Sequence, residues 1–444
     1  MRLLPTLLFP LCSPLLWSGP GLAADLPIDR LDVPSGPSLS LAAAEQNALR
    51  HQPTIKQADG QTEAAAGRVE EARAGYLPQV TATATYQRRE GLVAQTTTGA
   101  VMLPPGAQAF NYWAFGIAGS QLIYDFNATA DRWRAAAVNR DAAESSAHGT
   151  LAQALLSVRR SYFQARAQRD LVLVAKDAVK NQEKHLDQIQ QFVGAGMRSQ
   201  IDLATARTAL ANSNLQLVSA TNGYAAGLAL LDQAMGVSPN QAFDLTDSEL
   251  PPVDGEDGDA TALLERALKG RPEVAVAEQQ QRAQELQVAA FRGGYGPALS
   301  ATGGYTDAGT ALDRLTQSWF VGLTASWAVL QGGLTRGQVR EAQGTLAALA
   351  AQNEIVRLQV GVDVEQGRLA VRAAKSSISA AAEALSNARD QLRLAEARYQ
   401  TGQGSVIELS DAQVAQTTAA AQDVSARYGL ASARAQLLTA LGVR

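Results

Sequence analysis

The sequence contains few of the residues from which most catalytic and metal sites are built. Its 444 residues include one cysteine and three histidines, which leaves little for a disulfide, a His/Cys metal site or a thiol nucleophile. Charged residues make up 18% of the chain, against roughly 25% in an average soluble protein, and aromatic residues only 5%. The net charge of −4 excludes a polybasic nucleic-acid-binding protein and a charge-driven disordered chain.

The first 24 residues have the pattern of a secretory signal peptide. Arg2 precedes an apolar run over 3–17, and Ala23 and Ala24 place small residues at the expected cleavage site. The run is too short and too often interrupted to serve as a membrane anchor. The single cysteine, Cys12, lies within it, so we expect the exported chain to contain no disulfide.

After residue 24 there is no apolar run of 18 or more residues, so the sequence predicts no membrane-spanning helix. Only helices and closed barrels satisfy all their backbone hydrogen bonds in lipid. The protein is therefore expected either to be soluble in the periplasm or to cross a membrane as a β-barrel.

The chain repeats itself once. Pro53 matches Pro272, and the residues that follow match at a constant spacing as far as Tyr86. The spacing then shortens once, before Gly116, so the first half carries an insertion. Surface loops tolerate insertions, which predicts a loop within residues 87–112. The predicted organisation is a first repeat over 25–237, an acidic linker or surface strap over 238–259, and a second repeat over 260–444.

Each half begins with an alanine-rich helical stretch that contains one proline. These stretches are Leu39–Ala74 and Thr261–Arg292, with Pro53 and Pro272 near their starts. Proline breaks or kinks a helix when it falls in the interior. We therefore expect a short helix followed by a longer one in each half.

Each half then continues into a very long helix. The segments Asn127–Val193 and Gly333–Gln400 contain no internal proline, and each would span about 100 Å as a helix. Leu385, Leu392 and Tyr399 recur every seven residues, which indicates a coiled-coil seam. A glycine-containing turn and a return helix of about half the length follow, so the shorter helices can stack end to end beside the long one.

Between the opening helices and the long helix, the hydrophobic period changes to two, as in a β-strand. Residues 79–86 alternate in this way, and so do residues 319–327, which begin and end with Trp319 and Trp327. Eight strand steps span roughly 26 Å, close to the height of the apolar band of an outer-membrane barrel with aromatic girdles at both rims. Trp113 belongs to the same outward pattern. A half-buried soluble sheet alternates similarly and remains the alternative.

These patterns predict four strands per chain. Four strands cannot close a barrel, and lipid tolerates no open sheet edge, so several chains would have to pool their strands. Three chains give about twelve strands, which leaves a water-filled lumen. The predicted fold class is an α+β membrane protein, a trimeric 12-stranded β-barrel continued by a long α-helical coiled-coil tunnel.

The order of these elements resembles the TolC-like outer-membrane efflux proteins over nearly the whole mature chain. The motifs that carry the resemblance are Gly75-Tyr76-Leu77-Pro78, Tyr295-Gly296-Pro297, Tyr124-Asp125-Phe126, Leu330-Gln331-Gly332-Gly333 and the turn from Tyr399 to Ala412. Each motif is weak alone. Their order, spacing and duplication together are specific.

The resemblance implies a homotrimer in the outer membrane of a Gram-negative bacterium, with a large periplasmic extension. It implies a passive exit duct, gated at its periplasmic tip, in a tripartite efflux pump or a type I secretion system. The implied partners are a periplasmic adaptor (membrane fusion protein) and an inner-membrane transporter, which decides the cargo. The alternative is a soluble periplasmic coiled-coil scaffold or adaptor whose sheet packs internally.

The resemblance also implies an acidic ring at the narrow periplasmic entrance. The matching positions are Glu408 and Asp411, one helical turn apart on one face of a helix. Six carboxylates from three chains would favour cations and bind divalent ions. The first-half equivalents are Asp202 and Thr205, so the doubled acid belongs to the second half only. Stabilisation of the helix dipole would explain a single carboxylate equally well.

A latch and a docking surface are implied by the same resemblance. Asp202 and Tyr399 match a pair that the family uses to hold neighbouring helices shut. The family's best-known member has a basic residue where this chain has Gly404, so the latch here is expected to be weaker or built differently. The tips presented to the adaptor match Gly194, Gly196, Arg198, Gly402 and Gly404, although turn formation alone would also explain the glycines.

No catalytic constellation is found in the sequence. His51, His148 and His185 are isolated from one another and from the cysteine, and we expect all three at solvated helix positions. We therefore predict no enzymatic activity, no cofactor, no metal site and no nucleic-acid partner.

Overall fold

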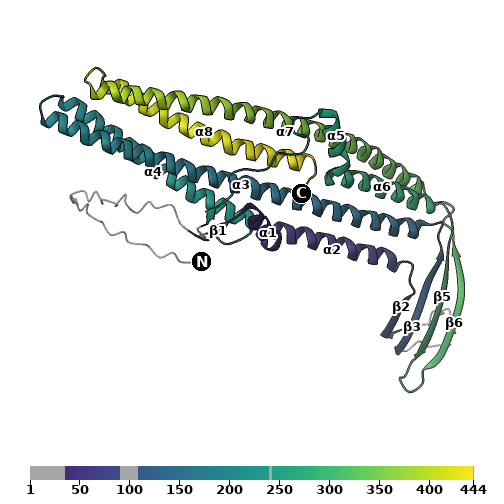
Figure 1. Ribbon diagram of the computed structural model, residues 1–444. Coiled ribbons are helices and arrows are strands. Elements are labelled where there is room, and N and C mark those ends of the chain that lie inside the picture. Colours follow the sequence, from purple (N-terminus) through teal and green to yellow (C-terminus); the bar gives the residue numbers. More distant parts are fainter. Residues whose placement is uncertain (1–35, 91–108, 240–242, 444) are drawn as a thin grey trace, which may run out of the picture.

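The computed structural model describes residues 36–90, 109–239 and 243–443. The predicted signal peptide and most of the loop predicted within 87–112 lie outside these residues. The described part is elongated, with two helical hairpins running toward one end and a small sheet at the other (Figure 1).

Two long antiparallel hairpins form the length of the molecule (Figure 1). Helix α3 (Ala128–Gly194) turns into α4 (Gln200–Met235), and α7 (Leu334–Gln400) turns into α8 (Val406–Ala440). Both α3 and α7 have 67 residues, which confirms the predicted long helices to within one residue at each end. Among the described helices, none is both long and apolar enough to cross a bilayer.

Two shorter helices precede each hairpin. They are α1 (Leu41–His51) and α2 (Pro53–Ala74) in the first half, and α5 (Ala260–Gly270) and α6 (Pro272–Gly293) in the second. Both α2 and α6 begin with their proline, at a position where the missing N–H costs no helical hydrogen bond. The predicted break at each proline is therefore confirmed.

The return helix α4 ends against the junction of α1 and α2. Gln52, between these two short helices, donates its side-chain amide to the carbonyls of Gln233 (3.3 Å) and Ala234 (3.0 Å) near the end of α4. In the second half, the carbonyl oxygen of Leu441, just after α8, lies 3.1 Å from the position that a Cβ of Gly270 would occupy. Short helices thus meet end to end beside each long helix, as predicted.

Four antiparallel strands form the sheet at the far end of the molecule. They are β2 (Gln79–Arg89), β3 (Phe110–Tyr124), β5 (Ala298–Gly309) and β6 (Thr316–Ser326), paired in the order β2-β3-β5-β6. Each half of the chain supplies one hairpin, and the two hairpins join through β3 and β5. In the described chain, nothing pairs with the outer edges of β2 and β6.

The register of the sheet separates two kinds of surface. One row contains Ala82, Ile117, Tyr305 and Trp319, and the adjacent row, on the opposite face, contains Thr83, Gly116, Thr306 and Ser318. The apolar face is bare, since Val80 is 70% and Val321 80% exposed. Figure 1 shows the sheet standing beyond the ends of the helices. A soluble sheet packed against its own chain would not leave this face open.

Trp319 and Trp327 do not lie at the two ends of β6. Trp327 comes one residue after β6 ends at Ser326, and its indole nitrogen donates to the carbonyl of Tyr295 (3.1 Å). Trp319 is the fourth residue of β6, and Trp113 packs on Tyr86 with ring centroids 4.4 Å apart. The prediction that Trp319 and Trp327 begin and end one strand was therefore wrong, because β6 starts three residues before Trp319 and ends one residue before Trp327. The assignment of Trp113, Trp319 and Trp327 to membrane girdles stays a prediction.

The acidic segment over 238–259 was predicted to be a surface strap rather than core, and this was wrong in part. Phe243 and Leu250 are buried in the cluster that joins the two hairpins, and Val253 is buried in the cluster of the second half. Strand β4 (Asp244–Leu245) also pairs in parallel with β1 (Ser38–Leu39). The segment crosses the helices at mid-length and contributes apolar side chains to their core.

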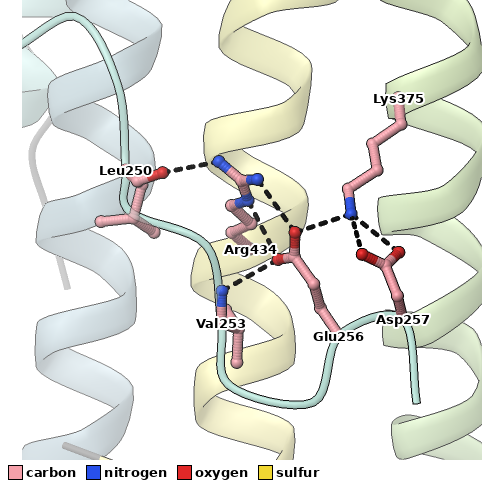
Figure 2. A network of polar contacts seen from close by, with 6 residues as sticks. All are labelled: Leu250, Val253, Glu256, Asp257, Lys375 and Arg434. Atoms are coloured by element: carbon pink, nitrogen blue, oxygen red, sulfur yellow. Dashed lines mark hydrogen bonds and ion pairs between the residues drawn. The ribbon is translucent and has the colours of Figure 1, made fainter.

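A buried ion-pair network ties this segment to both helices of the second hairpin (Figure 2). Glu256 accepts two hydrogen bonds from Arg434 of α8 (2.9 and 3.0 Å) and one from the backbone N–H of Val253 (2.9 Å). Lys375 of α7 lies 2.8 Å from Glu256 and 2.7 Å from Asp257. Desolvation alone would raise the pKa of Glu256, but these donors outweigh it and lower the pKa to about 2.

Because of this pKa shift, the free energy of unfolding depends on pH in the acid range. The folded pKa of Glu256 is below its unfolded value near 4.5, so its contribution is present above that value and lost as the pH falls toward 2. We expect Glu256→Gln to lower the free energy of unfolding at neutral pH by about 3 kcal/mol at most. The loss should shrink between pH 5 and pH 2.

The measurement is the guanidinium midpoint of the helical circular dichroism signal across this pH range. Glu249→Gln, an exposed acid of the same segment, is the control and should leave the midpoint unchanged. Equal midpoints for Glu256→Gln and the parent at pH 7 would contradict the stabilising role of this network.

Candidate functional site at the helix tips

The two turns that end the helical hairpins lie at the end of the molecule opposite the sheet (Figure 1). Each turn contains a glycine in the left-handed region, Gly196 with φ of 73° and Gly402 with φ of 77°. The next N–H in each turn bonds back into the preceding helix, from Met197 to the carbonyl of Phe192 in the first turn (2.9 Å). Both glycines are therefore required by the backbone of the turn.

The return helices begin with the same kind of cap but use their acids differently. Ser199 and Asp202 form a reciprocal capping box, in which each side chain accepts from the other residue's backbone N–H (both 3.3 Å). Ser405 accepts from the N–H of Glu408 (3.1 Å), but the Glu408 carboxylate does not bond back. The helix-capping role accounts for Asp202, whereas it leaves the Glu408 carboxylate available.

The Glu408 carboxylate has a cationic neighbour. One of its oxygens lies 3.5 Å from Nε of Arg398, in the last turn of α7. Asp411, three residues further along α8, is exposed, and among the described residues its carboxylate has no ion pair or hydrogen bond. The two acids of the predicted ring therefore lie on one face but in different electrostatic surroundings.

Tyr399 is the packing centre of the tips. It is 2% exposed and lies in a cluster with Ile189 of α3 and Leu409 of α8, so it holds the two hairpins together. The guanidinium of Arg198 lies 4.6 Å from the centre of its ring, and the ring of His185 packs edge-on at 5.3 Å. Burial raises the pKa of Tyr399 and lowers that of His185.

His185 was predicted to be solvated, and this was wrong. It lies one helical turn before Ile189 on the buried face of α3. The other two histidines, His51 and His148, are exposed as predicted. The spacing of four residues from Ile189 is the signal in the sequence that indicates the burial of His185.

The predicted latch pair does not touch in the described chain. The Asp202 carboxylate is used in the capping box, and the Tyr399 hydroxyl is buried with no hydrogen-bond partner among the described residues. The Asp202–Tyr399 latch remains a prediction. Across the described ranges, no group of three or more His, Cys, Asp or Glu side chains gathers within reach of one metal ion.

The packing around the second turn explains why position 404 is a glycine. A Cβ at this position would lie 3.0 Å from the backbone nitrogen of Tyr399 and 3.2 Å from Cβ of Arg398. By contrast, a Cβ at Gly194, at the end of α3, would meet nothing within 4 Å. The second turn therefore closes tightly on Arg398 and Tyr399 only because residue 404 has no side chain.

Comparison with known proteins gives the family. Residues 44–237 and 263–443 match the family described as outer membrane efflux protein. The chain is 26% identical over 393 residues to protein CyaE of Bordetella pertussis, covering 87% of this chain and 79% of that one. It is 25% identical over 440 residues to outer membrane protein TolC of Escherichia coli, covering 91% and 82%.

The fold agrees with this match. The crystal structure of the Campylobacter jejuni CmeC outer membrane channel superposes with a TM-score of 0.81 at 18% identity, covering 90% of this chain and 85% of that one. The protein thus belongs to the outer membrane efflux protein family. Members of this family are channels of the outer membrane rather than enzymes.

The close packing at Gly404 predicts that alanine is tolerated differently at positions 404 and 194. Gly404→Ala should destabilise the second turn by about 1 kcal/mol, because its new methyl group forces the backbone of α7 and the turn apart. Gly194→Ala, in open space at a helical position, should be neutral or slightly stabilising.

Hydrogen exchange of the amides over 395–409, read by mass spectrometry, measures this difference. Faster exchange is expected in Gly404→Ala alone. Equal protection in both variants would contradict the close approach at residue 404.

Proposed function

We propose that this protein is the passive exit duct of a tripartite efflux pump or type I secretion system. Three copies would form a 12-stranded barrel in the outer membrane, continued by a helical tunnel through the periplasm. An inner-membrane transporter would supply the energy, and a periplasmic adaptor would bind the tips at Gly194, Gly196, Arg198, Gly402 and Gly404.

The observation that carries this proposal is the sheet with two open edges and a bare apolar face. Among the described residues, the backbone N–H and C=O groups on the outer edges of β2 and β6 have no partner, and each would be costly in hydrocarbon. Pairing β6 of one copy with β2 of the next satisfies both edges and closes a ring. Family membership supports three copies, and twelve strands leave a lumen lined by the threonine-rich face.

The aromatic residues would mark the membrane boundaries of this barrel. Trp113, stacked on Tyr86, and the exposed Trp319 would lie in one girdle. Trp327, tied to the carbonyl of Tyr295 at the start of the helical part, would lie in the other. Indole rings favour such interfaces because they are apolar with one hydrogen-bond donor.

Cysteine cross-linking tests the ring closure, since the only cysteine lies in the predicted signal peptide. Ala82→Cys on β2, combined in turn with Val321→Cys, Leu323→Cys or Ala325→Cys on β6, places thiols on one face at the two edges. At least one pair should give a covalent trimer on a denaturing gel. Ile117→Cys on the inner strand β3, with the same partners, is the control. If the largest cross-linked species on the gel is a dimer, threefold closure is contradicted.

The tips would form the gate of the duct. Threefold symmetry would bring copies of Glu408 and Asp411 together as an acidic ring at the periplasmic entrance. Tyr399, which packs both hairpins against each other, would latch them with Asp202 of the same or a neighbouring chain. The buried and unpaired hydroxyl of Tyr399 supports this, because a buried donor without an acceptor is destabilised until a partner reaches it.

Ion selectivity in a planar bilayer tests the gate. The parent protein should show discrete, cation-preferring conductance steps that divalent cations block. The Glu408→Gln/Asp411→Asn double variant should lose most of the cation preference and the block. Asp390→Asn, on α7 above the tips, should behave like the parent.

If the parent protein shows no conductance, the Tyr399→Gly variant distinguishes a closed channel from no channel. This substitution removes the packing centre of the tips and should open them. Silence in both proteins would contradict the duct. Conductance with unchanged selectivity in the double variant would contradict the acidic ring but not the duct.

A further inference from the structure

The acids at the second turn are not equivalent, because among the described residues only Glu408 forms an ion pair. Nε of Arg398 is 3.5 Å from the Glu408 carboxylate, and both side chains are partly exposed. Among the described residues, Asp411 has no such partner. A pair of this kind is worth little for stability, but it changes the charge that an approaching ion experiences.

The backbone of Arg398 is held in place by the turn itself. Its carbonyl oxygen accepts hydrogen bonds from the N–H groups of both Gln403 and Gly404 (2.9 Å each). Gly404 packs against its Cβ, in space that a side chain would otherwise fill. The backbone and Cβ of Arg398 are therefore held on the α8 side of the turn, near Glu408.

The other nearby cations are engaged elsewhere. Arg198 lies over the ring of Tyr399, and Arg393, five residues before Arg398 on α7, pairs with Asp390 of the same helix (3.1 Å). Arg398 is thus the cation that the fold assigns to Glu408. No feature of helix capping needs it, since the cap of α8 is already formed by Ser405.

We propose that Arg398 determines the ion selectivity of the entrance by offsetting Glu408, so that Asp411 forms the ring that attracts and binds cations. This rests on the proposed function as a trimeric duct. In that assembly, three Arg398–Glu408 pairs contribute no net charge, and the entrance carries three uncompensated carboxylates rather than six. Removing the arginine charge would expose the second ring.

The expected size of the effect follows from Coulomb's law. One unit charge about 7 Å from a monovalent ion in water changes the local ion concentration about threefold, and the effect on a divalent ion is larger because the interaction energy doubles. Arg398→Gln should therefore lower the divalent concentration that gives half-block by at least about threefold and shift the reversal potential toward that of cations. Arg398→Lys, which keeps the charge, should resemble the parent.

The experiment compares these variants with Arg393→Gln, a matched control on the same helix. Single-channel block by Mg²⁺ is measured for each, together with Mn²⁺ affinity of the detergent-solubilised protein by electron paramagnetic resonance, which requires no open pore. The Arg398→Gln/Glu408→Gln double variant should resemble the parent in block, because it removes both charges of the pair. Asp411→Asn alone should abolish most of the block.

The outcomes separate the two proposals. If the parent conducts but Arg398→Gln matches Arg393→Gln in block and in Mn²⁺ affinity, this inference is overturned and the duct stands. A double variant Arg398→Gln/Glu408→Gln that is blocked as readily as Arg398→Gln alone would also overturn it, since the arginine would then not offset Glu408. Absence of conductance in both the parent and Tyr399→Gly would overturn the duct itself.

Discussion

The unpaired edges of β2 and β6 are the constraint on which the proposed architecture depends. A four-stranded sheet with one apolar face left bare has no stable place in water, and its open edges have none in lipid. Both problems are solved by the same step, the joining of identical sheets into a closed ring. In the proposed trimer, closure at the sheet end would also bring three sets of tips toward one axis, so that each side chain at the tips would occur three times around it.

Within one chain, the helices are held together at two levels. At mid-length, the segment around Glu256 joins α7 and α8 through Lys375 and Arg434 while its apolar residues enter the core (Figure 2). At the tips, Tyr399 joins the α3–α4 hairpin to the α7–α8 hairpin. The first level is a fully bonded ionic network, and the second is apolar packing around an unpaired hydroxyl.

Local sequence signals predicted the helices well and the contacts between them poorly. Pro53, Pro272 and the absence of proline from two long segments determine helix boundaries by backbone chemistry alone, and these boundaries were right. Trp327 was misplaced because alternation continues past the last paired residue of β6. The Arg398–Glu408 pair was missed because it depends on how two helices approach across a turn, and no spacing rule encodes this. The burial of His185 likewise depends on the partner hairpin.

The equal length of α3 and α7 has a consequence for how such a protein can change during evolution. Both helices have 67 residues, so their two turns end level with each other. Deleting one heptad from a single long helix would displace its turn by about 10 Å and separate Tyr399 from its packing partners on the other hairpin. Changes in the reach of the tunnel therefore have to occur in both halves of the gene together.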